Sequence, residues 1–385
     1  MRPTVTLSVG AVLGRLGMGQ GGYKIARALL DGGVSLRIIS VGAEPGALLS
    51  AHLDTVPLHR LASIISSTPL RLWPGLVLAT MNNYFDWRAS NLLNTADIFY
   101  GYSDQALWSM RAARQRGAVT VLHAANTHID SLAAELGTEA RRYDTRQSWI
   151  SPLMVWKIRQ EYAEADCIRT QSTLVRDSLI ARGIPAGKVA FVPPAVDLER
   201  FRLTPARDDV FRVAFVGSFD LRKGIQYLLQ AWDDARLPRA ELILHGGTGS
   251  RFMENMLKPY RNRPDVAFRS GDPAPTYADA SVCVVPSIED GFAYVVLEAL
   301  ASGCPVIVSD QVGGKDAVVE GENGFIVPAR DAAAIRDRLI ALCAAPRQRT
   351  RMAVAARESA ESYSFRAEGA RLCGTLTGLV QQHAV

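Results

Sequence analysis

Cysteine is scarce in this sequence, with five residues in a chain of 385 and no Cys-x-x-Cys pair. An odd number of widely spaced cysteines argues against a disulfide framework and against a zinc site. We therefore expect free thiols in a reducing cytosol.

Long apolar runs are also missing. No uninterrupted stretch approaches the roughly 20 residues that span a bilayer. The first residues lack the charged-then-apolar order of a signal peptide, because Gly10, Gly14, Arg15 and Gly17 interrupt the apolar pattern early. The expected location is cytoplasmic, with peripheral contact to the inner membrane face as an alternative.

Neither a strong charge bias nor a metal motif is present. The formal net charge is only +5, which suits anionic ligands or an anionic membrane surface but is too diffuse to indicate nucleic acid. An Asp-x-Asp motif is absent, and the pair Asp233–Asp234 lies in a helical pattern. We expect no metal and no other cofactor.

Short apolar runs alternate with helical patterns along the whole chain, as in parallel α/β sheets. The expected strands are 4–9, 34–41, 97–101, 118–123, 166–170 and 188–193, then 211–217, 241–247, 265–269, 281–286, 304–309 and 324–328. A proline-rich, charged stretch, PPAVDLERFRLTPARDD, separates the two series and is interpreted as a linker. The chain is long enough for two doubly wound domains, which implies a cleft between them, and ligands bind beyond the carboxyl ends of such strands.

The stretch PSIEDGFAYVVLEALASGCPVIVSD, residues 286–310, carries the strongest chemical pattern. A helix is expected from about Phe292 to Gly303, and its apolar interior holds one carboxylate, Glu298. A buried carboxylate needs hydrogen-bond donors. For Glu298 these donors come either from a partner in the fold, such as a backbone amide or an arginine, or from the two hydroxyls of a bound ribose. Asp290 precedes the helix and is either an N-cap or a ligand-binding acid, and the helix start can hold an anion.

A basic turn precedes this region. In FVGSFDLRKGIQYLLQAW, residues 215–232, Arg222 and Lys223 lie between a strand and a helix. Two adjacent cations in such a turn suit a diphosphate, although arginine–lysine pairs on solvated surfaces are common.

These motifs resemble the retaining glycosyltransferases of family 4, which have the GT-B fold of two Rossmann-like domains facing a central cleft. The family pattern of an acid, seven residues and a glutamate is matched by DGFAYVVLE, from Asp290 to Glu298. The family's phosphate loop corresponds to Gly217 through Gly224. The resemblance covers residues 160–365 well and the first 150 loosely. The acid is Asp290 where the family has glutamate, and Ser218 stands where the family has arginine.

The resemblance implies an N-terminal acceptor-side domain over residues 1–198 and a nucleotide-sugar-binding domain over 199–365, with a C-terminal helix at about 366–385 packing back on the first. It also implies that Lys223 and Arg222 assist departure of the diphosphate. Asp290 or Glu289 would orient the transferred sugar, and Glu298 would bind the ribose. The remaining donor-binding positions implied are Gly21, Gly22, Gly217, Gly291, Phe292 and Ala293.

The segment GMGQGG, residues 17–22, spells the Gly-x-Gly-x-x-Gly pattern of dinucleotide-binding proteins. In those proteins the glycines follow the first strand immediately, whereas here the strand is expected to end near Gly10. We therefore interpret the segment as the family's glycine loop, with Gly21 and Gly22 near the donor phosphates. An NAD-dependent oxidoreductase that uses this segment, with Glu44 as its ribose-binding acid, is the rival.

The acceptor side carries two histidines, His123 and His128. A family histidine in this region faces the transferred sugar, and a structural role is the alternative for each. The run 141–159 mixes basic and aromatic residues and is either a membrane or lipid contact or a solvated helix face.

Together these features predict a metal-independent, retaining glycosyltransferase that moves a sugar from a UDP- or GDP-linked donor to an acceptor hydroxyl in glycan, polysaccharide or glycolipid assembly. The expected partners are the nucleotide diphosphate sugar and a glycan or lipid-linked acceptor, with weak membrane contact and no nucleic acid. A non-catalytic nucleotide-sugar-binding protein is the third alternative.

Overall fold

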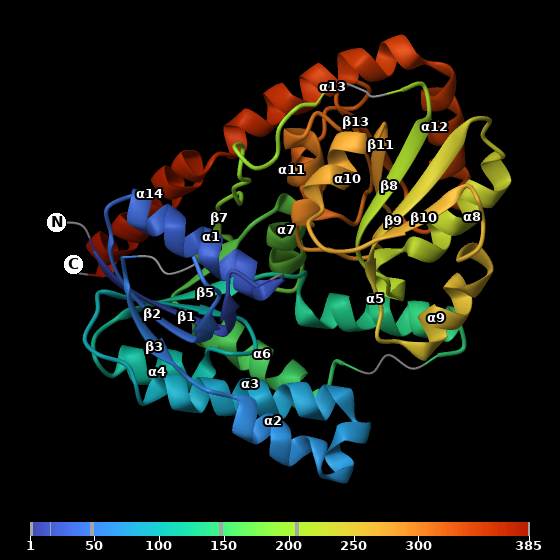
Figure 1. Cartoon of the computed structure of the whole chain (residues 1–385). Coiled ribbons are helices and arrows are strands. Elements are labelled where there is room, and N and C mark those ends of the chain that lie inside the picture. Colours follow the sequence, from blue (N-terminus) through green and yellow to red (C-terminus); the bar gives the residue numbers. More distant parts are fainter. Residues whose placement is uncertain (1–2, 16, 47–49, 146–148, 205–207, 384–385) are drawn as a thin grey trace. The chain divides into compact units, whose positions relative to one another are not determined.

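Two units, each built on one parallel sheet, make up the chain in the computed structural model (Figure 1). The structure describes residues 3–15, 17–46, 50–145, 149–204 and 208–383. Unit 1 comprises residues 1–137, 144–194 and 365–385, and unit 2 comprises residues 138–143 and 195–364.

The sheet of unit 1 has the strand order β3-β2-β1-β4-β5-β6-β7. Its strands are β1 (Thr4–Leu13), β2 (Ser35–Ala43), β3 (His52–Thr55), β4 (Ile98–Tyr102), β5 (Val119–Ala124), β6 (Cys167–Thr170) and β7 (Val189–Phe191). The helices are α1 (Met18–Asp31), α2 (His59–Ser66), α3 (Pro74–Ser90), α4 (Leu107–Arg114), α5 (Ile129–Arg142), α6 (Pro152–Glu164), α7 (Thr173–Ala181) and α14 (Phe365–His383), and the end of α5, from residue 138, belongs to unit 2. A 3₁₀ turn, η1 (Pro69–Leu72), joins α2 to α3.

The sheet of unit 2 has the order β10-β9-β8-β11-β12-β13. Its strands are β8 (Phe211–Ser218), β9 (Ala240–Gly247), β10 (Val266–Arg269), β11 (Val282–Val285), β12 (Val306–Ser309) and β13 (Gly324–Val327). The helices are α8 (Ile225–Ala235), α9 (Arg251–Leu257), α10 (Ala274–Asp279), α11 (Tyr294–Ala301), α12 (Ala332–Ala344) and α13 (Pro346–Ala360).

Each sheet therefore has a point where the strand order reverses, between β1 and β4 in unit 1 and between β8 and β11 in unit 2. Ligands of doubly wound sheets bind beyond the carboxyl ends of the strands at this switch point. The predicted α/β class with two Rossmann-like parallel sheets is confirmed.

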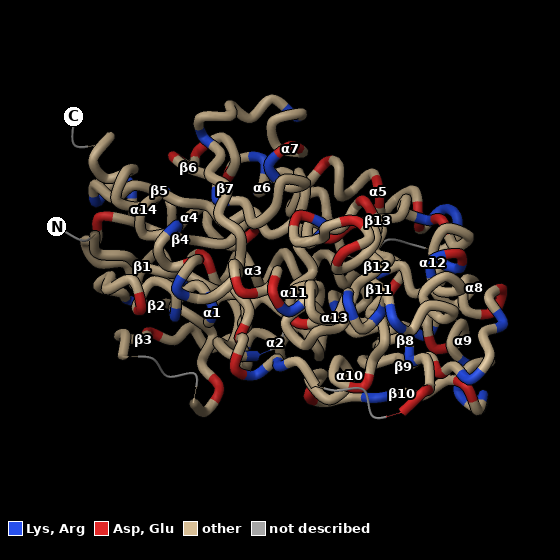
Figure 2. The backbone as a smooth tube through the Cα atoms, turned by 90° about the horizontal axis from the view of Figure 1, so that it is seen from above, with Lys and Arg blue, Asp and Glu red and all other residues tan. Residues whose placement is uncertain are grey.

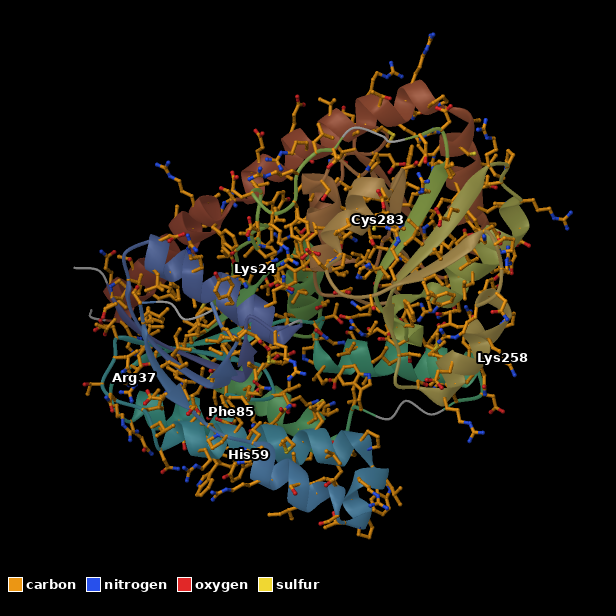
Figure 3. All side chains as sticks on the ribbon, in the orientation of Figure 1. Lys24, Arg37, His59, Phe85, Lys258 and Cys283 are labelled. Atoms are coloured by element: carbon orange, nitrogen blue, oxygen red, sulfur yellow. The ribbon has the colours of Figure 1, made fainter. Side chains whose placement is uncertain are left out.

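The expected strands all form, with small differences at their ends, because β-branched and apolar runs fill both sheets. In Figure 3 the Cys283 side chain, from β11, and the Phe85 side chain, from α3, are labelled, and both are fully buried. Two expectations were wrong. β1 continues past Gly10 to Leu13 through a register shift between Val9 and Val12, and the short edge strand β3 was not predicted.

The C-terminal helix α14 belongs to unit 1 and packs on α1, as Figure 1 shows for the red and blue helices. A Cβ on Gly369 would lie 2.6 Å from the Ala28 carbonyl oxygen, so glycine permits this close approach. Glu368 of α14 forms an ion pair with Arg169 of β6 at 2.9 Å, with both side chains buried. The expected helix over about 366–385 is observed as Phe365–His383, and residues 384–385 lie outside the described residues.

Basic and acidic residues are interspersed along the backbone (Figure 2). In the part of the chain that the structure describes, no helix is both long and apolar enough to cross a bilayer. All five cysteines are free thiols, and Cys167, Cys283 and Cys304 are buried.

Candidate functional site

The basic turn of unit 2 follows β8 directly. Asp220 caps the 3₁₀ turn η3 (Leu221–Lys223): its side chain accepts from the Lys223 amide at 2.9 Å and from the Ser218 hydroxyl at 2.5 Å. Gly224 has a φ of 70°, and a Cβ there would lie 1.9 Å from the Pro286 carbonyl oxygen. Only glycine fits this backbone, so the turn lies tightly against the loop that follows β11.

The acidic loop after β11 is held by its own backbone. The Asp290 amide donates to the Gln311 carbonyl at 3.0 Å, and the Gly313 amide donates to the Asp290 carbonyl at 2.8 Å. The Asp290 carboxylate accepts from the Ala293 amide at 2.9 Å. Asp290 is thus fixed from both sides at the switch point of unit 2.

The helix after this loop, α11, starts at Tyr294 instead of Phe292 and ends at Ala301 instead of Gly303. Ala293, with a φ of 60°, is its N-cap, so the predicted helix start was two residues early. The Ala293 amide, expected to face an anion, is engaged by Asp290 here. An anion at this position would have to share the Ala293 amide with the Asp290 carboxylate or displace that carboxylate.

The two loops bring four predicted site residues together. Lys223 Nζ donates to the Asp290 carboxylate. Arg222 Nη1 donates to the Glu289 carbonyl at 3.2 Å and lies 3.6 Å from the Glu289 carboxylate and 4.0 Å from that of Asp290. The site therefore pairs two cations with two carboxylates.

Burial and the neighbouring charges both shift the pKa values of this cluster. Burial alone would raise the pKa of Asp290, but Lys223 and then Arg222 outweigh it and hold that pKa below its usual value. Burial likewise opposes protonation of Arg222, yet Asp290 and Glu289 raise its pKa. The Asp290 carboxylate and the Arg222 guanidinium are thus both charged at neutral pH.

Glu298 lies buried in α11, as the pattern predicted, and it has a partner in the fold. The Tyr277 hydroxyl, from α10, donates to Glu298 Oε2 at 3.0 Å. Burial and the nearby Glu298 raise the pKa of Tyr277 well above its usual value, so it stays a donor. The sequence suggests a backbone amide or an arginine as the partner and does not indicate Tyr277, whose stretch carries no recognisable motif.

His123 is fully buried at the end of β5. Its Nδ1 lies 3.0 Å from the Tyr100 hydroxyl and 2.8 Å from Arg169 Nη1. Burial and then Arg169 lower the pKa of His123 well below its usual value. Because Nδ1 accepts, the ring is neutral and carries its proton on Nε2.

His128 lies at the start of α5. Its carbonyl accepts from the Leu132 amide at 2.9 Å, and its Nδ1 accepts from the Asp130 amide at 3.2 Å. Burial lowers the pKa of His128, with Asp130 opposing. Each histidine thus has a structural role and also a neutral ring with an Nε2–H donor.

The buried state of His123 predicts a pH-dependent stability. Below about pH 6.5 the unfolded chain binds a proton at His123 and the folded chain does not, so stability falls as the pH falls. Between pH 7.5 and 5.5 the free energy of unfolding of the wild type should fall by about 1.4 kcal/mol more than that of His123→Gln. Urea titrations at both pH values measure this.

The exposed His59, labelled in Figure 3, supplies the control. His59→Gln should lose the same free energy as the wild type over this range. Equal losses for wild type and His123→Gln would contradict the buried, neutral state of His123.

The GMGQGG segment differs from its expected conformation. Gly17 is the N-cap of α1, with a φ of 83°, and Gly21 and Gly22 lie inside the helix rather than in a loop. A Cβ on Gly22 would lie 2.9 Å from both methyl groups of Val9, so this glycine is needed where α1 packs on β1. Since β1 runs to Leu13, the expected long spacer between strand and glycines was also wrong.

The run 141–159 becomes the end of α5 and the start of α6, with residues 146–148 outside the described residues. Leu153 and Trp156 of α6 are exposed. Among the described residues, no group of three or more His, Cys, Asp or Glu side chains is arranged to hold a metal ion.

Family models match both halves of the chain. Residues 17–195 match a glycosyl transferase 4-like domain, and residues 198–359 match the glycosyl transferases group 1. The boundary between the two matches lies close to that between the main segments of units 1 and 2.

The chain is similar to curated proteins of known activity. A GDP-mannose-dependent alpha-(1-6)-phosphatidylinositol monomannoside mannosyltransferase of Mycolicibacterium smegmatis is 28% identical over 281 residues, which cover 64% of this chain and 74% of that protein. A D-inositol 3-phosphate glycosyltransferase of Corynebacterium efficiens is 27% identical over 343 residues, which cover 82% of this chain and 77% of that protein. A Kribbella flavida protein of the same description is 32% identical over 210 residues, which cover 48% of this chain and 49% of that protein. The chain thus spans about half to three quarters of these relatives.

Solved structures share the fold over nearly the whole chain. Sucrose-phosphate synthase from Thermosynechococcus elongatus aligns with a TM-score of 0.75 and 21% identity, covering 99% of this chain and all of that one. WaaG, a glycosyltransferase involved in lipopolysaccharide biosynthesis, aligns with a TM-score of 0.72 and 16% identity. The alignment covers 97% of this chain and 100% of that one. At these identities the likeness concerns the fold.

Proposed function

The chain belongs to the glycosyltransferases of the family 4 type with the GT-B fold, and on that premise we propose that it transfers a sugar, with retention of configuration, from a UDP- or GDP-linked donor to an acceptor hydroxyl. The observation that carries the proposal is the cluster of Arg222, Lys223, Glu289 and Asp290 at the switch point of unit 2.

The chemical difficulty is the departure of a diphosphate from an oxocarbenium-like carbon. Negative charge grows on the diphosphate as the bond to the sugar breaks, and we assign Lys223 and Arg222, on the turn η3, to the stabilisation of that charge. Gly224 and Asp220 anchor the backbone of this turn, so that a diphosphate has to compete only with the carboxylates that pair the two side chains. Two fixed cations supply the charge neutralisation that a metal ion would otherwise supply, and we propose a metal-independent reaction.

The carboxylates are assigned to the sugar parts of the donor. We assign Asp290, next to Lys223, to hydroxyls of the transferred sugar, with Glu289 as the neighbouring acid. Glu298 is assigned to the ribose, because a carboxylate accepts from two hydroxyls. Attack on the face from which the leaving group departs, with a phosphate oxygen taking the acceptor proton, is the step implied by family resemblance.

In unit 1 we assign His123 or His128 to a hydroxyl of the transferred sugar, since each has a neutral ring with an Nε2–H donor. Gly21 and Gly22, in the first turns of α1, are assigned to close approach of the donor phosphates. The acceptor class that we propose is a glycan or a lipid-linked polyol. The Mycolicibacterium relative is described as acting on a phosphatidylinositol mannoside and using GDP-mannose.

The rival functions are less favoured. The family model for a glycosyl transferase 4-like domain includes GMGQGG, which argues against an NAD-dependent oxidoreductase. A non-catalytic nucleotide-sugar-binding protein would share the site but give no product.

Ligand-induced stabilisation followed by product analysis tests the proposal. UDP or GDP at about 100 times its Kd should add about 2.7 kcal/mol to the free energy of unfolding and raise the melting temperature, whereas NAD should not. The matching nucleotide sugars, incubated with polyol and glycolipid acceptors in excess EDTA, should give a glycosylated product by mass spectrometry.

Three results would contradict parts of this proposal. A shift with NAD alone would favour the oxidoreductase. Turnover lost in EDTA and restored by magnesium or manganese would contradict the metal-independent step. Nucleotide binding without turnover of any donor, including its hydrolysis, would favour the binding protein.

A further inference from the structure

His245 is a buried histidine of unit 2 to which the proposed reaction assigns no role. It lies near the carboxyl end of β9, and only 5% of it is exposed. Its Nε2 lies 3.2 Å from the Gly271 carbonyl oxygen, and its Nδ1 lies 2.8 Å from the Thr276 hydroxyl. A carbonyl oxygen only accepts, so Nε2 carries the proton and donates to Gly271, while Nδ1 accepts from Thr276. The ring therefore joins the end of β9 to two points of the chain that follows β10.

The part of the chain that His245 holds is the short connection between β10 and α10, residues 270–272, which we call the β10–α10 segment. These residues are exposed. Gly271 has a φ of 92°, in the left-handed region that favours glycine. The Asp272 carboxylate accepts from the Ala274 amide at 3.1 Å and so ties the segment to the start of α10. A buried ring thus fixes a backbone that is itself open to a ligand.

The β10–α10 segment lies at the ligand-binding edge of its sheet. In parallel pairing β10 neighbours β9, and β9 neighbours β8, which leads into the basic turn (Figure 1). The carboxyl ends of the three strands therefore lie at one edge, where doubly wound sheets bind ligands. At this edge the Phe219 amide, just before the basic turn, donates to the Gly247 carbonyl at 2.8 Å. The segment and the proposed diphosphate site share this edge.

The proposed ribose site lies next to the same segment. Tyr277 of α10 donates to Glu298 Oε2 at 3.0 Å, and the adjacent residue, Thr276, is the partner of His245. The base and the diphosphate of a nucleotide leave the ribose from different carbons. With the ribose at Glu298 and the diphosphate at the basic turn, the base is directed toward α10 and the segment that precedes it.

We propose that His245 is a positioning residue for the base of the nucleotide donor. By holding Gly271 and Thr276, it fixes the β10–α10 segment so that backbone amides and carbonyls of the segment read the edge of the base. Uracil and guanine present donors and acceptors in different orders, so a segment fixed in one conformation distinguishes them. The inference rests on the proposed function, because it takes the basic turn as the diphosphate site and Glu298 as the ribose site.

Two variants of His245 separate its two hydrogen bonds. The amide nitrogen of glutamine can take the place of Nε2, and that of asparagine the place of Nδ1, so His245→Gln keeps a donor for Gly271 and His245→Asn does not. Calorimetric titration with UDP and GDP identifies the nucleotide that the wild type binds more tightly. The Kd of that nucleotide should rise about tenfold in His245→Asn and stay within about twofold of the wild type in His245→Gln.

Inorganic pyrophosphate distinguishes positioning of the base from a general effect on the fold. It has no base, so its Kd should be equal in the wild type and in both variants. The ratio of the Kd values for UDP and GDP should move toward one in His245→Asn. Steady-state kinetics of this variant should show a raised Michaelis constant for the donor and an unchanged turnover number, because the base takes no part in bond breaking.

Trp232→Phe is the matched control. The buried Trp232 of α8 donates from Nε1 to the Asp265 carboxylate at 2.9 Å, and Asp265 precedes β10 at the opposite end of that strand. This variant also removes one hydrogen bond between a buried ring and a residue next to β10, and it should leave both Kd values unchanged. If His245→Asn does not fold, Thr276→Val removes the hydroxyl bond to the same ring and should weaken binding of the nucleotide but not of pyrophosphate.

The possible failures are distinguishable. Equal nucleotide affinity in the wild type and His245→Asn, or an equal loss of pyrophosphate affinity, would overturn the inference and leave the proposed reaction intact. A tenfold loss in His245→Gln as well would overturn the role given to the Gly271 bond. A wild type that binds pyrophosphate but neither UDP nor GDP would contradict the proposed donor, and positioning of its base with it.

Discussion

Lys223→Ala should lower the turnover number on the order of 100-fold or more while changing the Michaelis constant for the donor far less. Lys223 is fixed by the Asp220 cap and lies against Asp290. If its partner during the reaction is the departing diphosphate, its stabilisation grows as the sugar bond breaks, so the loss appears in the transition state. Steady-state kinetics with the identified donor separate the two constants.

Two variants bracket this result. Lys258→Ala removes an exposed lysine of unit 2, labelled in Figure 3, and should leave both constants unchanged. Arg222→Ala should behave like Lys223→Ala if Arg222 replaces the family arginine absent at Ser218. Wild-type turnover for Lys223→Ala would show that the basic turn is not at the leaving group.

Much of the fold was predictable because local pattern and tertiary packing agree in most elements. Runs such as FRVAFVG are β-branched, apolar and bounded by turn residues, and each becomes a buried strand such as β8. The edge strand β3, HLDT, has four residues with mixed polarity and no apolar run, so periodicity gives no signal there. The extension of β1 past Gly10 depends on pairing with β2 beyond a register shift, which is a tertiary effect.

The candidate site was predictable to the extent that its residues lie in continuous motifs. Arg222, Lys223 and Asp290 come from two loops that leave adjacent strands, β8 and β11, so parallel topology brings them together. Tyr277 contacts Glu298 through packing of α10 on α11, and nothing local in the sequence indicates it. Likewise, the buried state of His123 depends on Arg169, 46 positions away in the sequence and on the neighbouring strand β6.

Asp290→Asn should lower turnover on the order of 10- to 100-fold while nucleoside diphosphate affinity stays equal to the wild type or rises. In the wild type the Asp290 carboxylate neutralises Lys223, and its pKa is held below the usual value, so it is ionised at neutral pH. Asparagine removes that competing charge, which leaves Lys223 more available to a diphosphate. The same change removes a charged acceptor assigned to the transferred sugar, and a hydrogen bond to a charged group is worth roughly 1.5–3 kcal/mol.

The structure also explains why this variant should fold. The asparagine side chain keeps an oxygen that can accept from the Ala293 amide, as Asp290 Oδ1 does at 2.9 Å, and the backbone bonds to Gln311 and Gly313 do not involve the side chain. Asp234→Asn, at an exposed position of α8, is the matched control and should change neither quantity. Calorimetric titration with UDP or GDP gives the affinity, and steady-state assays give the turnover number. Weaker nucleotide binding with unchanged turnover would reverse the assignment, because Asp290 would then support the diphosphate site instead of the sugar.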